Sequence, residues 1–223
     1  MKNKTVLFFD FYGTLVKPSS IWSRAICVVA QKNGYSVDQS LIREQLDGFT
    51  WDYPENDYTH LTNPDNWWDH TNKAFEAVLL KNNIKKDLVK DIRSLVIAKE
   101  NYTPFDDTIT VLNYLKNKGY TLAVLSNNFP ELYDVLKELE MDIFFDKCLV
   151  SSLVGYEKPH KEIFNFAKRQ YPDINNFYMI GDNPVADIKG AKDCGFSTIL
   201  VNNTSISEAD YTFSSLSGLL QIF

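Results

Sequence analysis

In two places the sequence has an apolar run that is followed closely by acidic or hydroxyl residues, and in a third place a lysine precedes a proline. Asp10 and Thr14 follow the first run, Asp182 and Asp187 follow a later one, and Lys158 precedes the proline. A carboxylate in such a place can act as a nucleophile, hold a cation or only cap a turn. A lysine can balance a catalytic anion or lie in solvent. These residues therefore admit both a catalytic and a structural interpretation.

Ser126 and Asn127 stand after a further apolar run, residues 121–125. Because the carboxyl ends of parallel strands meet at one edge of a sheet, we expect them to lie near the three acidic residues. Three carboxylates that meet there would raise one another's pKa values unless positive charge is present. Lys158 offsets one negative charge, and a divalent cation would offset the remainder. Mg²⁺ suits carboxylate, carbonyl and water oxygens, so it is the predicted cofactor.

Apolar runs that alternate with helical patterns position these residues. Short runs rich in β-branched and aromatic residues predict strands buried in a parallel sheet, and the segments between them predict helices. The expected strands are residues 4–9, 121–125, 148–150, 177–180 and 198–201, with a last strand near residue 211. This order predicts an α/β fold built on a doubly wound parallel sheet.

Between the first two strands, residues 16–103 lack a convincing strand pattern and show helical spacing instead. Helices are expected from about residues 21, 40 and 64, and a fourth over residues 86–99. A helical insertion of this size would form a lid over Asp10. The sequence therefore predicts a core made of residues 1–15 and 104–223, with a helical unit formed by residues 16–103.

The composition is that of a globular protein, with 44% hydrophobic and 23% charged residues. A net charge of −6 disfavours nucleic acid and anionic membranes as partners. The apolar runs fall short of the ~20 residues that a membrane-spanning helix needs. The three cysteines lack metal-site spacing, which favours free thiols in a reducing cytoplasm. We therefore expect a cytoplasmic monomer or homodimer that acts on a small molecule.

Four motifs in this order resemble the haloacid dehalogenase (HAD) superfamily over essentially the whole chain. They are Asp10-Phe11-Tyr12-Gly13-Thr14, Ser126-Asn127, Lys158-Pro159 and Gly181-Asp182-Asn183-Pro184-Val185-Ala186-Asp187. Each motif alone is a weak signal, whereas four in order at expected strand ends are a strong one. The resemblance implies a hydrolase with a Rossmann-like core and an inserted small α-helical cap, here residues 16–103.

The resemblance also implies roles for individual residues. Asp10 is the nucleophile, and the Thr14 hydroxyl orients the nucleophile or the phosphate. Ser126, Asn127 and Lys158 stabilise charge on the transferring oxygens.

The same resemblance implies a Mg²⁺ site made by Asp10, the backbone carbonyl of Tyr12 and Asp182. Asp187 belongs to this acidic group, and we expect it to act beside the metal ligands rather than on the metal. Tyr12 and Asn127 are further candidates for contact with substrate.

One position departs from the pattern of the family's phosphatases. They carry a second aspartate two residues after the nucleophile as general acid and base, and here that residue is Tyr12. Dehalogenases of the family carry Tyr-Gly-Thr at this point, cleave a carbon–halogen bond and need no metal. Arg43 stands about where those enzymes keep an arginine for halide or carboxylate, and Trp51 is a further candidate for substrate contact.

Asp182 favours the phosphatase, because dehalogenases carry a neutral residue at its position. An extra carboxylate beside an anionic haloacid would be electrostatically unfavourable. We therefore expect a Mg²⁺-dependent phosphatase that acts on a small phosphorylated metabolite through an aspartyl-phosphate on Asp10. Two alternatives stay open: a metal-independent 2-haloacid dehalogenase, and a weakly active or non-catalytic module that binds phosphate and Mg²⁺.

Overall fold

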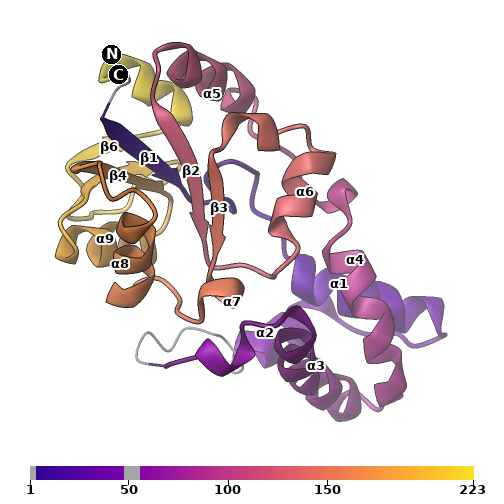
Figure 1. The fold of residues 1–223 in the computed structure, drawn as a ribbon. Coiled ribbons are helices and arrows are strands. Elements are labelled where there is room, and N and C mark those ends of the chain that lie inside the picture. The colour runs from indigo at the N-terminus through magenta and orange to yellow at the C-terminus, as the bar shows by residue number, and fades with distance from the viewer. Residues whose placement is uncertain (1–3, 48–55) are drawn as a thin grey trace.

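The computed structural model describes residues 4–47 and 56–223, whose strands form one parallel sheet (Figure 1). Every neighbouring pair of strands is parallel. Within the described residues the sheet has the order β3-β2-β1-β4-β5-β6, with strands β1 (Thr5–Phe9), β2 (Thr121–Ser126), β3 (Lys147–Val150), β4 (Asn176–Gly181), β5 (Ser197–Val201) and β6 (Tyr211–Phe213). The predicted α/β fold with a doubly wound sheet is confirmed.

Alternate residues of β1 face two separate apolar layers, as expected for a strand covered on both faces. Leu7 and Phe9 belong to the layer that includes α5 and α6, whereas Val6 and Phe8 belong to the layer that includes α8 and α9. The covering helices are α5 (Thr108–Asn117), α6 (Leu132–Glu138), α8 (Lys161–Arg169) and α9 (Gly190–Asp193). Helices on both faces leave the strand ends as the place where polar residues can gather.

The register of the central strands brings the predicted site residues to one edge. Phe9 of β1 lies opposite Ile180 of β4, so Asp10 and Asp182 leave the sheet on the same side. Ser126 ends β2, the neighbour of β1 on its other side. Figure 1 shows helices α1, α2 and α3 gathered beyond this carboxyl edge of the sheet.

The segment inserted between β1 and α5 is helical, as expected, but less regular. Residues 86–99 do not form the single helix that the sequence predicts, since a 3₁₀-helix precedes the short α4. The prediction misses this because the sequence shows the spacing of the apolar residues and not the tightness of the turns. The elements are α1 (Ile21–Lys32), α2 (Gln39–Asp47), η1 (Thr59–Leu61), α3 (Pro64–Lys81), η2 (Lys86–Asp91), α4 (Ile92–Val96) and η3 (Lys99–Asn101). That residues 16–103 form a separate cap domain stays a proposal.

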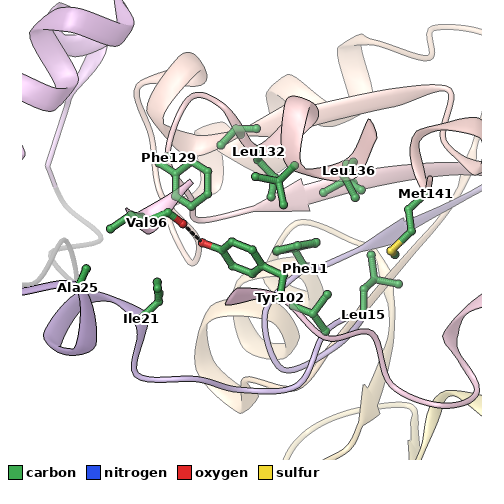
Figure 2. Close-up of a cluster of buried hydrophobic side chains, with 14 of the residues drawn as sticks. Phe11, Leu15, Ile21, Ala25, Val96, Tyr102, Phe129, Leu132, Leu136 and Met141 are labelled. Atoms are coloured by element: carbon green, nitrogen blue, oxygen red, sulfur yellow. Dashed lines mark hydrogen bonds between the residues drawn. The ribbon is translucent and has the colours of Figure 1, made fainter. Parts of the chain in front are cut away.

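An apolar cluster joins the inserted segment to the helices beside the sheet (Figure 2). It combines Phe11 at the end of β1 with Ile21 and Val96 of the inserted segment and Leu136 of α6. The Tyr102 hydroxyl lies inside this cluster and donates a hydrogen bond to the Val96 carbonyl oxygen at 2.7 Å. The inserted helices therefore share a continuous core with the sheet.

The remaining elements are short. A left-handed glycine, Gly155, ends the helix that follows β3. In the part of the chain that is described, no helix is both long and apolar enough to cross a membrane. The cytoplasmic location, the lack of a nucleic-acid partner and the oligomeric state stay predictions. The short elements are η4 (Asp142–Phe144), α7 (Ser151–Val154), η5 (Pro184–Lys189) and η6 (Leu216–Gln221).

Gly190 allows α9 to approach the loop that carries Lys158. A Cβ atom at this position would lie 2.7 Å from Pro159 Cα and 2.8 Å from the Phe164 ring. Gly190→Ala should therefore lower the free energy of unfolding by roughly 1–3 kcal/mol through overpacking, although alanine is the better helix former by about 1 kcal/mol. Urea unfolding measures this. The exposed Lys189→Ala serves as the control, and an unchanged or raised stability of Gly190→Ala would contradict the packing argument.

Candidate active site

A buried lysine lies between two of the predicted carboxylates. The Lys158 ammonium is 2.8 Å from Asp10 Oδ1 and 2.5 Å from Asp187 Oδ1, and its side chain is only 2% exposed. Burial alone would lower the pKa of Lys158, but the charges of Asp10 and Asp187 raise it above its ordinary value. The lysine is therefore held as a cation that both carboxylates neutralise.

Local backbone structure places Asp187 beside this lysine. Asp187 lies in η5, a stretch of π-helix, and its Oδ2 accepts a hydrogen bond from the Asn183 backbone N–H at 3.0 Å. Gly181 makes room for it, because a Cβ there would lie 2.2 Å from the Asp187 carboxyl carbon. The sequence predicts an ordinary α-helix over residues 184–194, but the wider π-turns come first and α9 follows. Both oxygens of Asp187 are therefore held by protein groups.

Asp182 lies against the turn that follows Asp10. The Thr14 hydroxyl is 3.4 Å from Asp182 Oδ1 and is oriented to donate to it. Gly13 has φ +80°, and a Cβ there would lie 2.3 Å from Asp182 Oδ2, so only glycine fits both the conformation and the space. The predicted first and fourth motifs are therefore in direct contact.

Asp10, Asp182 and Asp187 form a single carboxylate group. One oxygen from each can be chosen so that all three lie within 4.8 Å of one another. Burial, together with the charges of Asp10 and Asp187, raises the pKa of Asp182 to about 7. With all three ionised, the single charge of Lys158 leaves a net charge of −2 in this group. The oxygen donors and the missing charge both fit a divalent cation.

The end of β2 fixes the backbone of Lys158. The Asn127 side-chain amide accepts from the Lys158 backbone N–H at 2.7 Å and donates to the Lys158 carbonyl oxygen at 2.8 Å. Ser126 is buried, and its hydroxyl oxygen accepts from the Asn128 side-chain amide nitrogen at 3.5 Å. In this arrangement Asn127 positions the lysine, and a role for Asn127 or Ser126 toward a bound substrate stays a prediction.

The other predicted substrate contacts differ in their placement. Tyr12 is half-buried, and its hydroxyl oxygen accepts a hydrogen bond from the Ser19 backbone N–H at the start of the inserted segment. Arg43 is exposed on α2. Trp51 lies outside the described residues. Substrate contact by Tyr12, Arg43 or Trp51 stays a prediction.

Two asparagines after β5 hold the site, although the sequence analysis does not select them. The Asn202 amide donates to the carbonyl oxygens of Gly13 and Thr14 at 3.0 and 3.1 Å, and the Asn203 amide donates to the Asp182 carbonyl oxygen at 2.7 Å. Their signal is slight, since asparagines at a strand end are also ordinary turn residues. They connect the turn after Asp10 to the loop that carries Asp182.

The arrangement of motifs at the strand ends agrees with comparison to known proteins. A family model described as haloacid dehalogenase-like hydrolase matches residues 4–195. The chain belongs to this family. It is therefore a hydrolase, and the resemblance drawn from the four motifs is confirmed.

Relatives within the family carry both of the activities that the sequence leaves open. Glyceraldehyde 3-phosphate phosphatase from Pyrococcus furiosus is 28% identical over 238 residues, which cover 100% of this chain and 94% of the relative. (S)-2-haloacid dehalogenase 4A from Burkholderia cepacia is 27% identical over 213 residues, which cover 93% and 87% of the two chains. A phosphatase of the same name from Methanothermobacter thermautotrophicus is 38% identical, but over only 52% of each chain.

Solved structures agree on the fold. The HAD hydrolase YfnB from Bacillus subtilis, in a magnesium-bound structure, superposes with a TM-score of 0.80 at 21% identity and covers 100% of this chain and 99% of its own. L-2-haloacid dehalogenase from Xanthobacter autotrophicus superposes with a TM-score of 0.70 at 18% identity, over 98% and 97% of the two chains. At these identities the likeness concerns the fold alone.

Removing one carboxylate should stabilise the protein when divalent cations are chelated. The folded state raises the pKa of Asp182 from its ordinary 3.8 to about 7, so the wild type loses stability as pH rises from about 4 to about 7. Asp182→Asn avoids this loss. Above pH 7 its free energy of unfolding should exceed that of the wild type by roughly 2–4 kcal/mol, and the gain should shrink toward pH 4.

Urea unfolding in excess chelator across this pH range measures the difference. Asp106→Asn is the control, because its carboxylate is 94% exposed and pairs with surface Lys17. A stability of Asp182→Asn equal to or below that of the wild type at pH 8 would show that the three carboxylates do not repel one another as the geometry requires.

Proposed function

We propose that the protein is a Mg²⁺-dependent phosphatase that acts on a small phosphorylated metabolite through an aspartyl-phosphate on Asp10. The observation that supports it most is the group of three close carboxylates, two of which contact the buried Lys158. When all three are ionised, this group and the lysine carry a net charge of −2. A phosphate ester brings further negative charge, so a site of this kind needs a divalent cation to bind it. The relatives named for glyceraldehyde 3-phosphate support a small phosphate ester as substrate.

The residues present suit Mg²⁺. Asp10, Asp182 and the Tyr12 carbonyl would hold it, whereas the Asp187 oxygens already engage Lys158 and the Asn183 backbone. When bound, Mg²⁺ would supply charge that offsets the carboxylates and the phosphate oxygens.

Each residue then has a defined part in the reaction. An Asp10 oxygen attacks phosphorus, a new P–O bond forms and the ester P–O bond breaks, with the electron pair leaving on the alcohol oxygen. Lys158 stabilises charge that develops on the phosphoryl oxygens, together with Ser126 and Asn127. Water then attacks phosphorus, which releases phosphate and regenerates Asp10.

Tyr12 limits the first step. Its hydroxyl accepts a hydrogen bond from the Ser19 N–H, and a phenol stands where a carboxylic acid would protonate the leaving alcohol. The leaving alcohol must therefore take its proton from water. Esters with acidic leaving groups, such as aryl phosphates, should react faster than alkyl phosphates.

A 2-haloacid dehalogenase is the second candidate, and Tyr12-Gly13-Thr14 is the observation that favours it. In that reaction Asp10 would attack carbon and displace halide without a metal. Asp182 opposes it, because a third carboxylate close to the nucleophile would repel a haloacid anion.

Parallel assays distinguish the two reactions. Phosphate release from 4-nitrophenyl phosphate and chloride release from 2-chloropropionate are measured with Mg²⁺ and with excess chelator, and Asp10→Asn is the control. We expect phosphate release that needs Mg²⁺ and is lost in Asp10→Asn. Chloride release that resists the chelator would refute the phosphatase in favour of the dehalogenase.

Restoring an acid at position 12 should speed the slow step. General acid catalysis is worth about 10²–10⁴-fold, so Tyr12→Asp should raise kcat on an alkyl phosphate by roughly 10²-fold and change the aryl phosphate much less. Tyr12→Phe is the control, since it removes the hydroxyl without adding an acid. Equal effects of Tyr12→Asp on both substrates would show that protonation of the leaving group does not limit turnover.

A further inference from the structure

Glu131, which directly precedes α6, contacts the inserted helices from the side of the sheet. Its carboxylate pairs with the Arg93 guanidinium of α4, and its two oxygens accept from the Trp68 indole N–H of α3 at 3.1 and 3.0 Å. The Arg93 guanidinium also lies over the Trp68 ring, 5.3 Å from the centroid. We call Glu131, Arg93 and Trp68 the Glu131 cluster.

The cluster is largely shielded from water. The Glu131 side chain is 15% exposed and Trp68 is 2% exposed, whereas Arg93 keeps 38% of its side chain in solvent. Hydrogen bonds to a charged group in such surroundings are stronger than those on the surface. Removing the carboxylate would leave a buried indole N–H and a half-buried guanidinium with weaker partners. The cluster is therefore a strong contact, unlike an exposed ion pair.

A single loop connects this cluster to the candidate active site. Residues 126–131 begin at the end of β2, where Asn127 holds the backbone of Lys158, and finish at Glu131. Within the loop, the Phe129 ring lies 6.4 Å from the Trp68 ring between centroids. Phe129 also belongs to the apolar cluster of Figure 2. The place of the inserted helices and the place of Lys158 thus depend on the same six residues.

We propose that Glu131 is a positioning residue that holds the inserted helices closed over the candidate active site through Arg93 and Trp68. With the cluster intact, the closed arrangement is the one that substrate meets. Without the cluster, most of the molecules are open at any moment. The apparent affinity for substrate then falls in proportion to the fraction of molecules that stay closed. Once substrate has bound, the closed complex of the variant is the same as that of the wild type. KM should therefore rise while kcat changes little.

Hydrogen exchange tests the contact itself. Amides of α4 and of the first turns of α3 should exchange about 100-fold faster in Glu131→Gln and in Arg93→Gln than in the wild type, because the helices open more often. Asp134→Asn is the matched control, since it removes a carboxylate of the same helix whose partner, Lys137, is exposed. Unchanged exchange in Glu131→Gln and Arg93→Gln would overturn the proposal.

Kinetics test the function of the contact, and only this readout rests on the proposed phosphatase. With 4-nitrophenyl phosphate, Glu131→Gln should raise KM about tenfold with kcat within about threefold of wild type. Arg93→Lys keeps the positive charge, so it should keep most of the substrate affinity that Arg93→Gln loses. The double variant Glu131→Gln/Arg93→Gln should be no worse than the worse single variant, because both remove one contact.

Additive effects in the double variant, or a fall in kcat at constant KM, would overturn the positioning role. A wild-type protein that releases no phosphate would refute the proposed function instead. The exchange rates would still decide whether Glu131 holds the helices, and the same kinetic comparison would then use chloride release.

Discussion

The site depends on the ion pairs that the buried Lys158 makes with Asp10 and Asp187. An ammonium that has left water is tolerated only when opposite charge and hydrogen bonds replace its hydration. Asp187 reaches it through a π-helical turn and the space beside Gly181, and Asn127 fixes its backbone. The lysine satisfies two carboxylates, and Asp182 is the third. Much of the local structure is explained by the need to keep these charges close without letting them repel one another.

The sheet supplies the framework for this arrangement, and the inserted helices complete it. Parallel strands with helices on both faces leave their carboxyl ends as the common edge for polar residues. The inserted segment lies beyond that edge and joins the rest of the protein through an apolar cluster and through Glu131. The loop after β2 therefore contacts both parts, since Asn127 binds the Lys158 backbone and Glu131 binds the inserted helices.

The sequence predicts the sheet and the group of acidic residues because both depend on local patterns. An apolar run followed by Asp10, or by Asp182, specifies a strand and its end, and the parallel order then brings the ends together. Contacts between distant segments leave no such pattern. Neither the pairing of Glu131 with Trp68 nor the Asn202 bonds to the turn after Asp10 could be found by spacing. The sequence pattern does not distinguish the 3₁₀-turns of residues 86–91 or the π-turns of residues 184–189 from an α-helix, because it shows the spacing of apolar residues and not the tightness of each turn.

Titration calorimetry with Mg²⁺ tests the central claim most directly, because it asks whether the charge missing around Lys158 is supplied by a divalent cation. At pH 8, where Asp182 is ionised, we expect one Mg²⁺ to bind per chain of wild-type protein, and no binding to Asp10→Asn or Asp182→Asn. A wild-type protein that binds no Mg²⁺, or binding that both variants retain unchanged, would contradict the account.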